Sequence, residues 1–456
     1  MPDNPWDLGP IPRPDPRPVL DRSRAAAWLL SASLTLLPLT APAEELQGAL
    51  SPYAGRTVTA IAVEGLRVTR EFVARREIRT AVGQPLRVDL VAADVQRLDN
   101  LSVFAEVEVL AADDAQGVRL TFRVKEMPSW IAWAGYSYTD QDGFSGGPKM
   151  SALNFAGRAI SLNAKAYFGG ADQYSARFLW PWIAGDHLSL DVFAARLSRR
   201  DTLNGFKETS YELTPAVGTY LGDHGRVKGL FSLFEMNSDV DGKTLDPDNQ
   251  DLLARFGASF GWDTRDSWRL PRRGWQNELE VWRTAGDAHF WSMNLDLRRW
   301  LPIRKRQKVL LSGLASLQSG TAEEDVPVYL LYRMGGANSI RGYEIEDLGV
   351  RLYGKNQLIG TAEYSVTVLP LRRFDIWKFA LRLGLEAAVF TDAGIAWSAP
   401  GELAMNRVKG GMGAGLRLLV PGSEMVRFDV GWSAEGGIHF HFASGTKPVA
   451  QRLRLR

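Results

Sequence analysis

One arginine and two distant carboxylates are the residues best placed to do chemistry in this chain. Arg341 lies in the glycine-rich stretch 335–343 (Gly-Gly-Ala-Asn-Ser-Ile-Arg-Gly-Tyr), while Glu363 and Asp392 follow in segments of alternating polarity. A guanidinium held between carboxylates away from water makes charge-assisted hydrogen bonds that fix geometry. This set contains no nucleophile, so the pattern predicts a structural latch rather than a catalytic centre.

The parity of the flanking residues locates both carboxylates on one face. In residues 358–370 the apolar side chains hold even positions, so Glu363 faces the polar side. Asp392 shares its parity with Arg382 and Glu386, opposite to the leucines between them. We therefore expect the two carboxylates to lie on adjacent strands and to point to the same side.

The longest gap between strands, residues 319–357, carries the arginine. If this loop folds inward, Arg341 reaches both carboxylates, and an exposed arginine on a solvated loop is the alternative. Gly335, Gly336 and Gly342 would let the loop backbone approach the wall closely, and Tyr343 could stack against it.

Regular alternation of apolar and polar residues begins at Trp130. Sixteen such runs between turn signals predict an even-numbered antiparallel transmembrane β-barrel over residues 128–444, since bacterial barrels have even strand numbers. Thirteen of the 15 tryptophans fall there, as expected for interfacial girdles. The runs start near residues 130, 147, 158, 173, 186, 207, 225, 252, 274, 290, 306, 358, 376, 407, 424 and 437.

Composition narrows the class of protein further. The chain has 456 residues, no cysteine and a formal charge of +2, which excludes disulfides and thiol chemistry and argues against nucleic-acid binding. His439 and His441 could share a metal, but no third ligand suggests itself, so we expect no metal and no cofactor. Gly257 to Gly261 fits a hydrolase motif but lies within an alternating strand, so we do not expect an enzyme.

The two ends of the chain are expected to lie outside the fold. Arg22 and Arg24 precede an apolar stretch and the small-residue pattern Ala41-Pro42-Ala43, which predicts a signal peptide and leader over residues 1–43. Residues 44–55 are expected to be a linker. Residues 445–456 form a basic tail.

A small α+β domain is predicted over residues 56–127. A strand (58–63) is followed by a helix (69–82), a second helix opening at Asp89, and two strands (105–110 and 117–126), in the order β-α-α-β-β. Its motifs Ile61-x-Val63-x-Gly65 and Gly83-Gln84-Pro85-Leu86 resemble those of a single POTRA domain. Edge strands of such a sheet can accept an extended peptide.

The barrel segment resembles the BamA/TamA superfamily of outer-membrane assembly proteins. The resemblance rests on Ile340 to Tyr343, Glu363, Phe390-x-Asp392-x-Gly394, Gly413-x-Gly415-Leu416-Arg417 and the stretch containing Asp263, Arg265 and Asp266. It implies that the arginine loop is the sixth extracellular loop. It also implies a weak seam between the first and last strands, with Trp130 and Trp133 on one side and Gly436, Gly437, Phe440 and Phe442 on the other.

This resemblance implies an outer-membrane protein assembly (insertion) or translocation factor of a Gram-negative bacterium. Its POTRA domain would lie in the periplasm and capture unfolded outer-membrane or secreted clients, and the seam would act as a lateral gate. Outer-membrane lipid and a periplasmic or inner-membrane partner are the other expected contacts. A passive pore, or a scaffold docked through POTRA without insertase activity, is the alternative.

Overall fold

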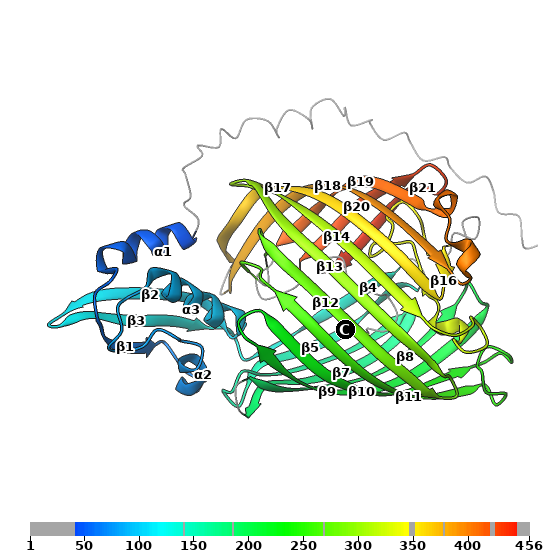
Figure 1. The fold of residues 1–456 in the computed structure, drawn as a ribbon, viewed down its shortest axis with the longest axis horizontal. Helices are drawn as coiled ribbons and strands as arrows, with labels where there is room; N and C mark the ends of the chain where they lie inside the picture. Colours follow the sequence, from blue (N-terminus) through cyan, green and yellow to red (C-terminus); the bar gives the residue numbers. More distant parts are fainter. Residues whose placement is uncertain are drawn as a thin grey trace, which may run out of the picture.

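The computed structural model describes residues 42–139, 142–184, 187–267, 270–345, 352–376, 379–419 and 425–444. It contains a three-stranded sheet with helices and a 16-stranded antiparallel sheet that curls into a barrel beside it (Figure 1). The predicted signal peptide, apart from its last two residues, and the predicted basic tail lie outside the described residues.

The small domain has the expected β-α-α-β-β order: β1 (Val58–Glu64), α2 (Glu71–Arg75), α3 (Val88–Asn100), β2 (Phe104–Asp114) and β3 (Gly117–Glu126). The sheet order is β1-β3-β2, so β2 is an edge strand. Its core is built from alternating residues of β3, with Val118, Leu120 and Phe122 fully buried.

Helix α2, the first of the two helices predicted for the small domain, is much shorter than the predicted helix over residues 69–82. Helix α2 ends at Arg75, although apolar residues continue at helical spacing to Val82. The buried carboxylate of Asp94 accepts hydrogen bonds from the backbone N–H groups of Arg79 (2.8 Å) and Thr80 (3.0 Å). Because the Asp94 side chain on α3 binds these two N–H groups, they are not available for helical hydrogen bonds, and α2 does not continue through Arg79 and Thr80.

The expectation that residues 44–55 form a linker is wrong. Helix α1 (Pro42–Leu50) and a 3-10 turn (Ser51–Tyr53) occupy most of this segment. Leu50 is fully buried in the core of the small domain, and α1 contacts α3 and β2. Burial of this leucine, which propensity alone does not show, makes the segment part of the domain.

Among the described residues, no helix has the length and apolarity needed to cross a membrane.

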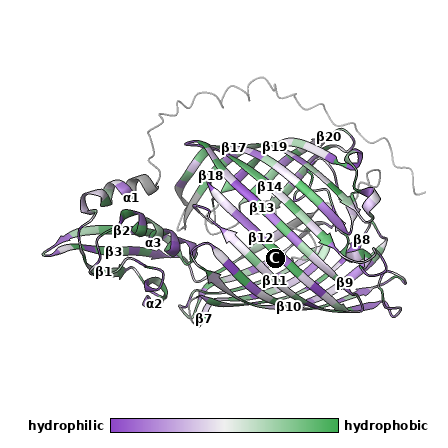
Figure 2. Ribbon diagram, in the orientation of Figure 1, coloured by the Kyte–Doolittle hydropathy of each residue, from purple (hydrophilic) through white to green (hydrophobic). Residues whose placement is uncertain are grey.

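The barrel strands start within four residues of the predicted positions, and each pairs with its neighbours in the chain. Hydrophilic and hydrophobic residues alternate along them (Figure 2). The strands are β4 (Trp130–Thr139), β5 (Gly143–Phe155), β6 (Ile160–Gly169), β7 (Ala171–Ala184), β8 (Leu188–Asp201), β9 (Phe206–Leu221), β10 (Gly225–Ser238), β11 (Gln250–Asp263), β12 (Gly274–Gly286), β13 (Phe290–Arg304), β14 (Gln307–Gln318), β17 (Asn356–Ile376), β18 (Phe379–Trp397), β19 (Lys409–Leu419), β20 (Val426–Ser433) and β21 (Gly437–Ser444).

The barrel sheet is not closed by hydrogen bonds. Strands β4 and β21 are its two edges, and among the described residues no ladder joins them. They face each other through an aromatic contact, with the rings of Tyr136 and Phe442 5.1 Å apart. A closed barrel would pair every backbone group, whereas the described residues of β4 and β21 form no ladder across this seam.

Contacts with three turns at one end of the barrel hold the small domain in place. Asn154, at the end of β5, donates a 2.8 Å hydrogen bond to the hydroxyl of Thr69. The guanidinium of Arg76 lies 4.3 Å from the ring centre of Trp182, and Arg79 pairs with Asp223 in the β9–β10 turn. We call this end of the barrel the POTRA end and the opposite end the loop end.

Candidate functional site

The arginine of the long loop is enclosed by the carboxylates that the sequence assigns to it. Arg341 is fully buried and binds Asp392 through Nε (2.9 Å), Nη2 (3.2 Å) and its backbone N–H (3.1 Å). Its Nη1 donates to Glu363 at 3.0 Å. The guanidinium carbon lies 3.3 Å from the ring centre of Phe390, so the aromatic face covers the cation as well.

Three further charged residues complete this latch cluster, and sequence reasoning did not assign them to it. Asp429 accepts from Arg341 at 3.2 Å and from Arg417 at 2.5 Å. Arg417 also donates to Glu363 at 2.7 Å, and Arg427 lies 3.7 Å from Asp429. The cluster thus contains three arginines and three carboxylates, so its formal charges sum to zero. Each desolvated charge lies beside an opposite one, which offsets the cost of burying it.

Two glycines give the loop the turn that presents its arginine. Gly335 (φ +112°) and Gly336 (φ +76°) adopt backbone conformations that favour glycine. The N–H of Gly336 donates to the carbonyl of Tyr343 at 2.7 Å, and that of Gly335 donates to the hydroxyl of Ser339 at 3.1 Å. The segment between them is therefore a compact, self-supported tip with Arg341 near its end.

The tip touches the wall backbone to backbone at Gly342. A Cβ added there would lie 2.7 Å from the carbonyl carbon of Trp432, and its φ is +107°. On the wall, a Cβ at Gly431 would lie 2.6 Å from the nitrogen of Gly342, and one at Gly436 would lie 2.4 Å from its oxygen. Gly436 is therefore closely packed against the loop tip, whereas Gly437 next to it faces open space.

The loop also contacts the last strand, β21. The N–H of Gly342 points to Nε2 of His441 at 3.4 Å, and Glu344 lies 3.1 Å from Nδ1 of His439. These two histidines face the loop from the polar side of β21. The tip therefore binds the strand that forms one side of the seam.

The first half of the loop is anchored on a different part of the barrel. The hydroxyl of Tyr329 donates to Asp251 on β11 at 2.7 Å, and Arg333 forms a buried ion pair with Asp201 at the end of β8. A buried apolar cluster that includes Phe206 and Phe290 packs around them. The loop therefore connects the walls formed by β8–β13 and by β17–β21.

The other residues of the barrel motifs have separate positions. Gly394 faces the loop, since a Cβ there would lie 2.3 Å from the side chain of Met334. Asp263 and Arg265 pair with each other at 2.5 Å in the β11–β12 turn, and Asp266 accepts from the N–H of Arg272 at 2.9 Å. The structure therefore places these three residues at the POTRA end, away from the latch.

The aromatic residues assigned to the seam lie on both of its sides. Trp130 and Trp133 on β4 are exposed, at 53% and 39%, and Phe440 on β21 is 75% exposed. Phe442 contacts both Tyr136 across the seam and Phe428 within the sheet, at ring separations of 5.1 and 4.7 Å. In the described parts of β4 and β21, apolar side chains rather than a backbone ladder therefore line this junction.

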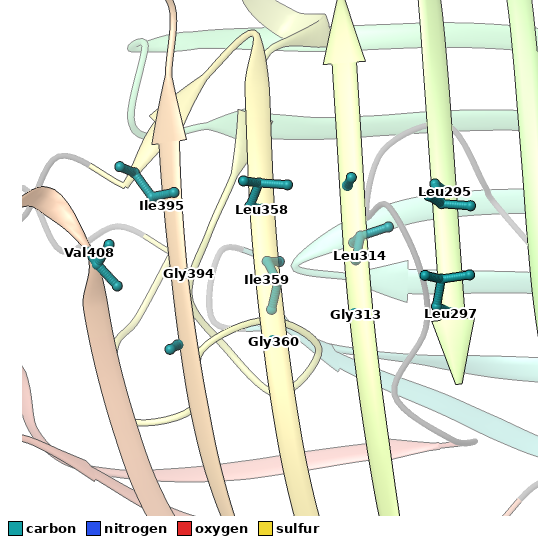
Figure 3. Close-up of a pocket in the computed structure, with 12 residues that line it drawn as sticks. Leu295, Leu297, Gly313, Leu314, Leu358, Ile359, Gly360, Gly394, Ile395 and Val408 are labelled. Atoms are coloured by element: carbon teal, nitrogen blue, oxygen red, sulfur yellow. The ribbon is translucent and has the colours of Figure 1, made fainter. Parts of the chain in front are cut away.

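A shallow groove crosses several strands of the barrel wall (Figure 3). Small residues, among them Gly313 and Gly360, lie between larger apolar side chains such as Leu295 and Leu358. The residues that line it carry no titratable side chain. The groove therefore supplies no group for acid–base or nucleophilic chemistry.

Comparisons with known proteins agree with this architecture. The Omp85 superfamily domain matches residues 154–447, and a POTRA domain, the surface antigen variable number repeat, matches residues 56–127. The chain is 25% identical over 399 residues to the outer membrane protein assembly factor BamA of Nitratidesulfovibrio vulgaris, covering 83% of this chain and 49% of that protein. It is 23% identical over 386 residues to BamA of Neisseria meningitidis serogroup B, covering 75% and 46%. The chain thus spans about half the length of these curated relatives.

Solved structures show the same fold. BamA from Haemophilus ducreyi lacking POTRA domains 1–3 superposes with a TM-score of 0.56 at 18% identity, covering 85% of this chain and 83% of that one. CdiB from Acinetobacter baumannii gives 0.52 at 13% identity, covering 86% and 73%. Because the superfamily domain matches more than half of the chain, the protein belongs to the Omp85 superfamily.

Proposed function

We propose that this protein is a non-enzymatic assembly factor of the Gram-negative outer membrane that inserts or translocates client proteins, with its POTRA domain in the periplasm. The observation that carries the proposal is the seam, where two edge strands of a membrane barrel meet without a hydrogen-bonded ladder in the described residues. In hydrocarbon each unsatisfied backbone group costs several kcal/mol. An incoming client strand would satisfy these groups by pairing with β4 or β21.

The POTRA domain offers a similar edge in the aqueous phase. Strand β2 lies at one side of the three-stranded sheet, and its Leu110 is 43% exposed. Main-chain hydrogen bonds to such an edge bind extended segments of varied sequence. The proposed order of events is capture on β2, transfer along the POTRA end of the barrel, and pairing at the seam.

The latched loop favours this role over that of a passive pore. From Val326 to Tyr343 most of the loop is buried, and it contacts inward-facing residues on both sides of the barrel. A barrel that served only for diffusion would not need a buried loop bound to the strands beside its seam.

Site-specific photocrosslinking in outer membranes tests the proposal. Probes at Trp133 on β4, Leu110 on β2 and, as a control on the lipid-facing wall, Phe256 on β11 would be compared. We expect adducts with nascent outer-membrane or secreted proteins at the first two positions and not at the third. Adducts at Trp133 with lipid alone, together with one constant periplasmic protein at Leu110, would instead identify a scaffold. A large steady conductance without client would identify a pore.

A further inference from the structure

Positive charge is concentrated in two neighbouring turns at the POTRA end. The described parts of the β11–β12 and β13–β14 turns, taken together with the last residues of β11 and β13, carry six basic residues against two aspartates. Asp263 pairs with Arg265 at 2.5 Å, and Asp266 accepts the backbone N–H of Arg272 at 2.9 Å. Both carboxylates therefore have partners within their own turn. The six basic residues, which we call the basic ridge, are Arg265, Arg272, Arg273, Arg304, Lys305 and Arg306.

The two turns form one surface. Nη2 of Arg272 donates to the carbonyl oxygen of Arg304 at 3.2 Å and also to that of Lys305. Arg273, Arg304 and Lys305 are exposed. These contacts hold cationic side chains of two turns side by side, so their fields add over a short distance.

The ridge lies beside an aromatic and apolar band on the outer wall. Trp262 and Trp275, each 42% exposed, lie one residue inside the end of β11 and the start of β12, and Ile303 next to the ridge is 55% exposed. The guanidinium of Arg299 lies 4.8 Å from the ring centre of Trp275. Tryptophans of membrane proteins collect at the level of the lipid headgroups. We therefore expect the ridge to stand at the depth of the lipid phosphate groups.

The small domain docks elsewhere on the same end of the barrel. Its contacts are with Asn154, Trp182 and Asp223, which lie in or next to the turns β5–β6, β7–β8 and β9–β10. Those turns lack a comparable cluster of arginines and lysines in the sequence. Docking and positive charge thus occupy different arcs of the rim.

We propose that the basic ridge binds the phosphate headgroups of anionic phospholipids in the periplasmic leaflet of the outer membrane. This inference rests on the proposed orientation of the barrel, with POTRA in the periplasm. Guanidinium groups bind phosphate through paired N–H donors, and clustered basic residues at a membrane surface attract anionic lipid. Binding on the arc that includes β11–β14 would fix the height of the barrel there, opposite the seam in strand order.

Native mass spectrometry of the full-length protein tests the ridge. Protein in neutral detergent would be titrated with dioctanoyl phosphatidylglycerol and, separately, with dioctanoyl phosphatidylcholine. We expect the wild type to retain the anionic lipid preferentially, and an Arg273→Glu/Arg304→Glu/Lys305→Glu variant to bind it on the order of a hundredfold more weakly, from roughly fivefold per basic residue. Added salt should weaken the wild-type binding.

A matched variant controls for total charge. Arg200→Glu/Lys207→Glu/Lys243→Glu changes the same number of charges at the loop end and should bind as the wild type does. If charge reversal prevents folding, the corresponding triple glutamine variant should still lose most of the preference. Equal retention of phosphatidylglycerol by the ridge variant and the wild type would overturn the proposal. A ridge that bound an acidic protein instead of lipid would give this result.

A separate measurement distinguishes failure of this inference from failure of the proposed function. Arg304→Cys, in a chain without native cysteine, should resist a membrane-impermeant maleimide in intact cells. Labelling in intact cells would overturn the orientation and with it both proposals. Protection together with no phosphatidylglycerol preference would overturn the ridge alone.

Discussion

Ser433 on β20 donates a 2.6 Å hydrogen bond from its hydroxyl to the carbonyl oxygen of Gly342 in the loop. The same hydroxyl accepts the N–H of Gly436 at 2.8 Å, so one side chain joins the loop tip to the β20–β21 hairpin. The latch therefore has two components, the ion cluster around Arg341 and a backbone contact that only glycine permits. They can be separated by mutation.

Gly342→Ala should displace the loop tip without altering any charge. The new Cβ would lie 2.7 Å from the carbonyl carbon of Trp432, at a φ that alanine rarely adopts. We expect faster maleimide labelling of a Ser339→Cys reporter, which is only 1% exposed in the intact loop. Gly313→Ala is the matched control, since its Cβ would meet nothing within 4 Å. Equal labelling in the two backgrounds would argue against the backbone contact.

Arg341→Ala should weaken the barrel more than loss of an ordinary ion pair. It leaves Asp392 and Asp429, at most 1% exposed as side chains, without the guanidinium that both of them bind, and breaking a buried pair costs about 3–5 kcal/mol. We expect the folded band on gels to be lost at a lower temperature, and Arg341→Lys to rescue only partly because lysine cannot bind bidentately.

The control for this experiment is Arg177→Ala. Arg177 pairs with Asp191 on the neighbouring strand at 2.5 Å, away from the loop, and its side chain is 31% exposed. The control should shift the transition little, since partly exposed pairs contribute about 0–1 kcal/mol. A similar shift in both variants would show that Arg341 is only one ion pair among many.

The parity of residues in the strands and the length of the loop were enough to predict that Arg341, Glu363 and Asp392 lie together. They were not enough to predict the other members of the latch cluster. Arg417 and Asp429 also occupy polar positions of alternating strands, so the same rule predicts that they face inward. Their height relative to the loop depends on strand register and shear, which the sequence pattern does not specify. The register that pairs Gly415 with Asp429 lets Arg417 bind both Asp429 and Glu363.

The errors in the small domain have a related origin. Periodicity predicted a helix to Val82, whereas the Asp94 carboxylate captures the N–H groups of Arg79 and Thr80. The segment 44–55 has only two leucines in its helix, Leu46 and Leu50, too few for a strong amphipathic signal. In both cases a tertiary contact overrides local propensity.

Fixing the seam should block activity if clients insert through it. In a Tyr136→Cys/Phe442→Cys variant, a short bis-maleimide would join β4 to β21, whose rings at these positions are 5.1 Å apart. We expect crosslinking to abolish assembly of outer-membrane proteins in reconstituted vesicles. The control pair Trp432→Cys/Ile438→Cys joins partners that are already in register on β20 and β21, and should leave activity unchanged. Full activity after crosslinking of the seam would exclude lateral insertion.

Glu126 should make the docking of the small domain depend on pH. Burial by itself would raise the pKa of this carboxyl, but hydrogen bonds from the Thr69 side chain and from the N–H groups of Arg67, Val68 and Thr69 outweigh it, so the pKa lies below its usual value. A group with a lowered pKa stabilises the folded state above the unfolded pKa of about 4.3, and this contribution is lost as pH falls through the folded pKa. Thr69 also binds Asn154 on the barrel, so the segment 67–69 that Glu126 holds includes the docking contact.

We expect amide hydrogen exchange at residues 67–69, corrected for its intrinsic pH dependence, to lose protection below about pH 4 in the wild type. In Glu126→Gln, protection should be lower at neutral pH and nearly independent of pH, whereas Glu108→Gln, on the same sheet, should behave as the wild type. A wild-type profile that is flat between pH 3 and 6 would show that Glu126 does not control this loop.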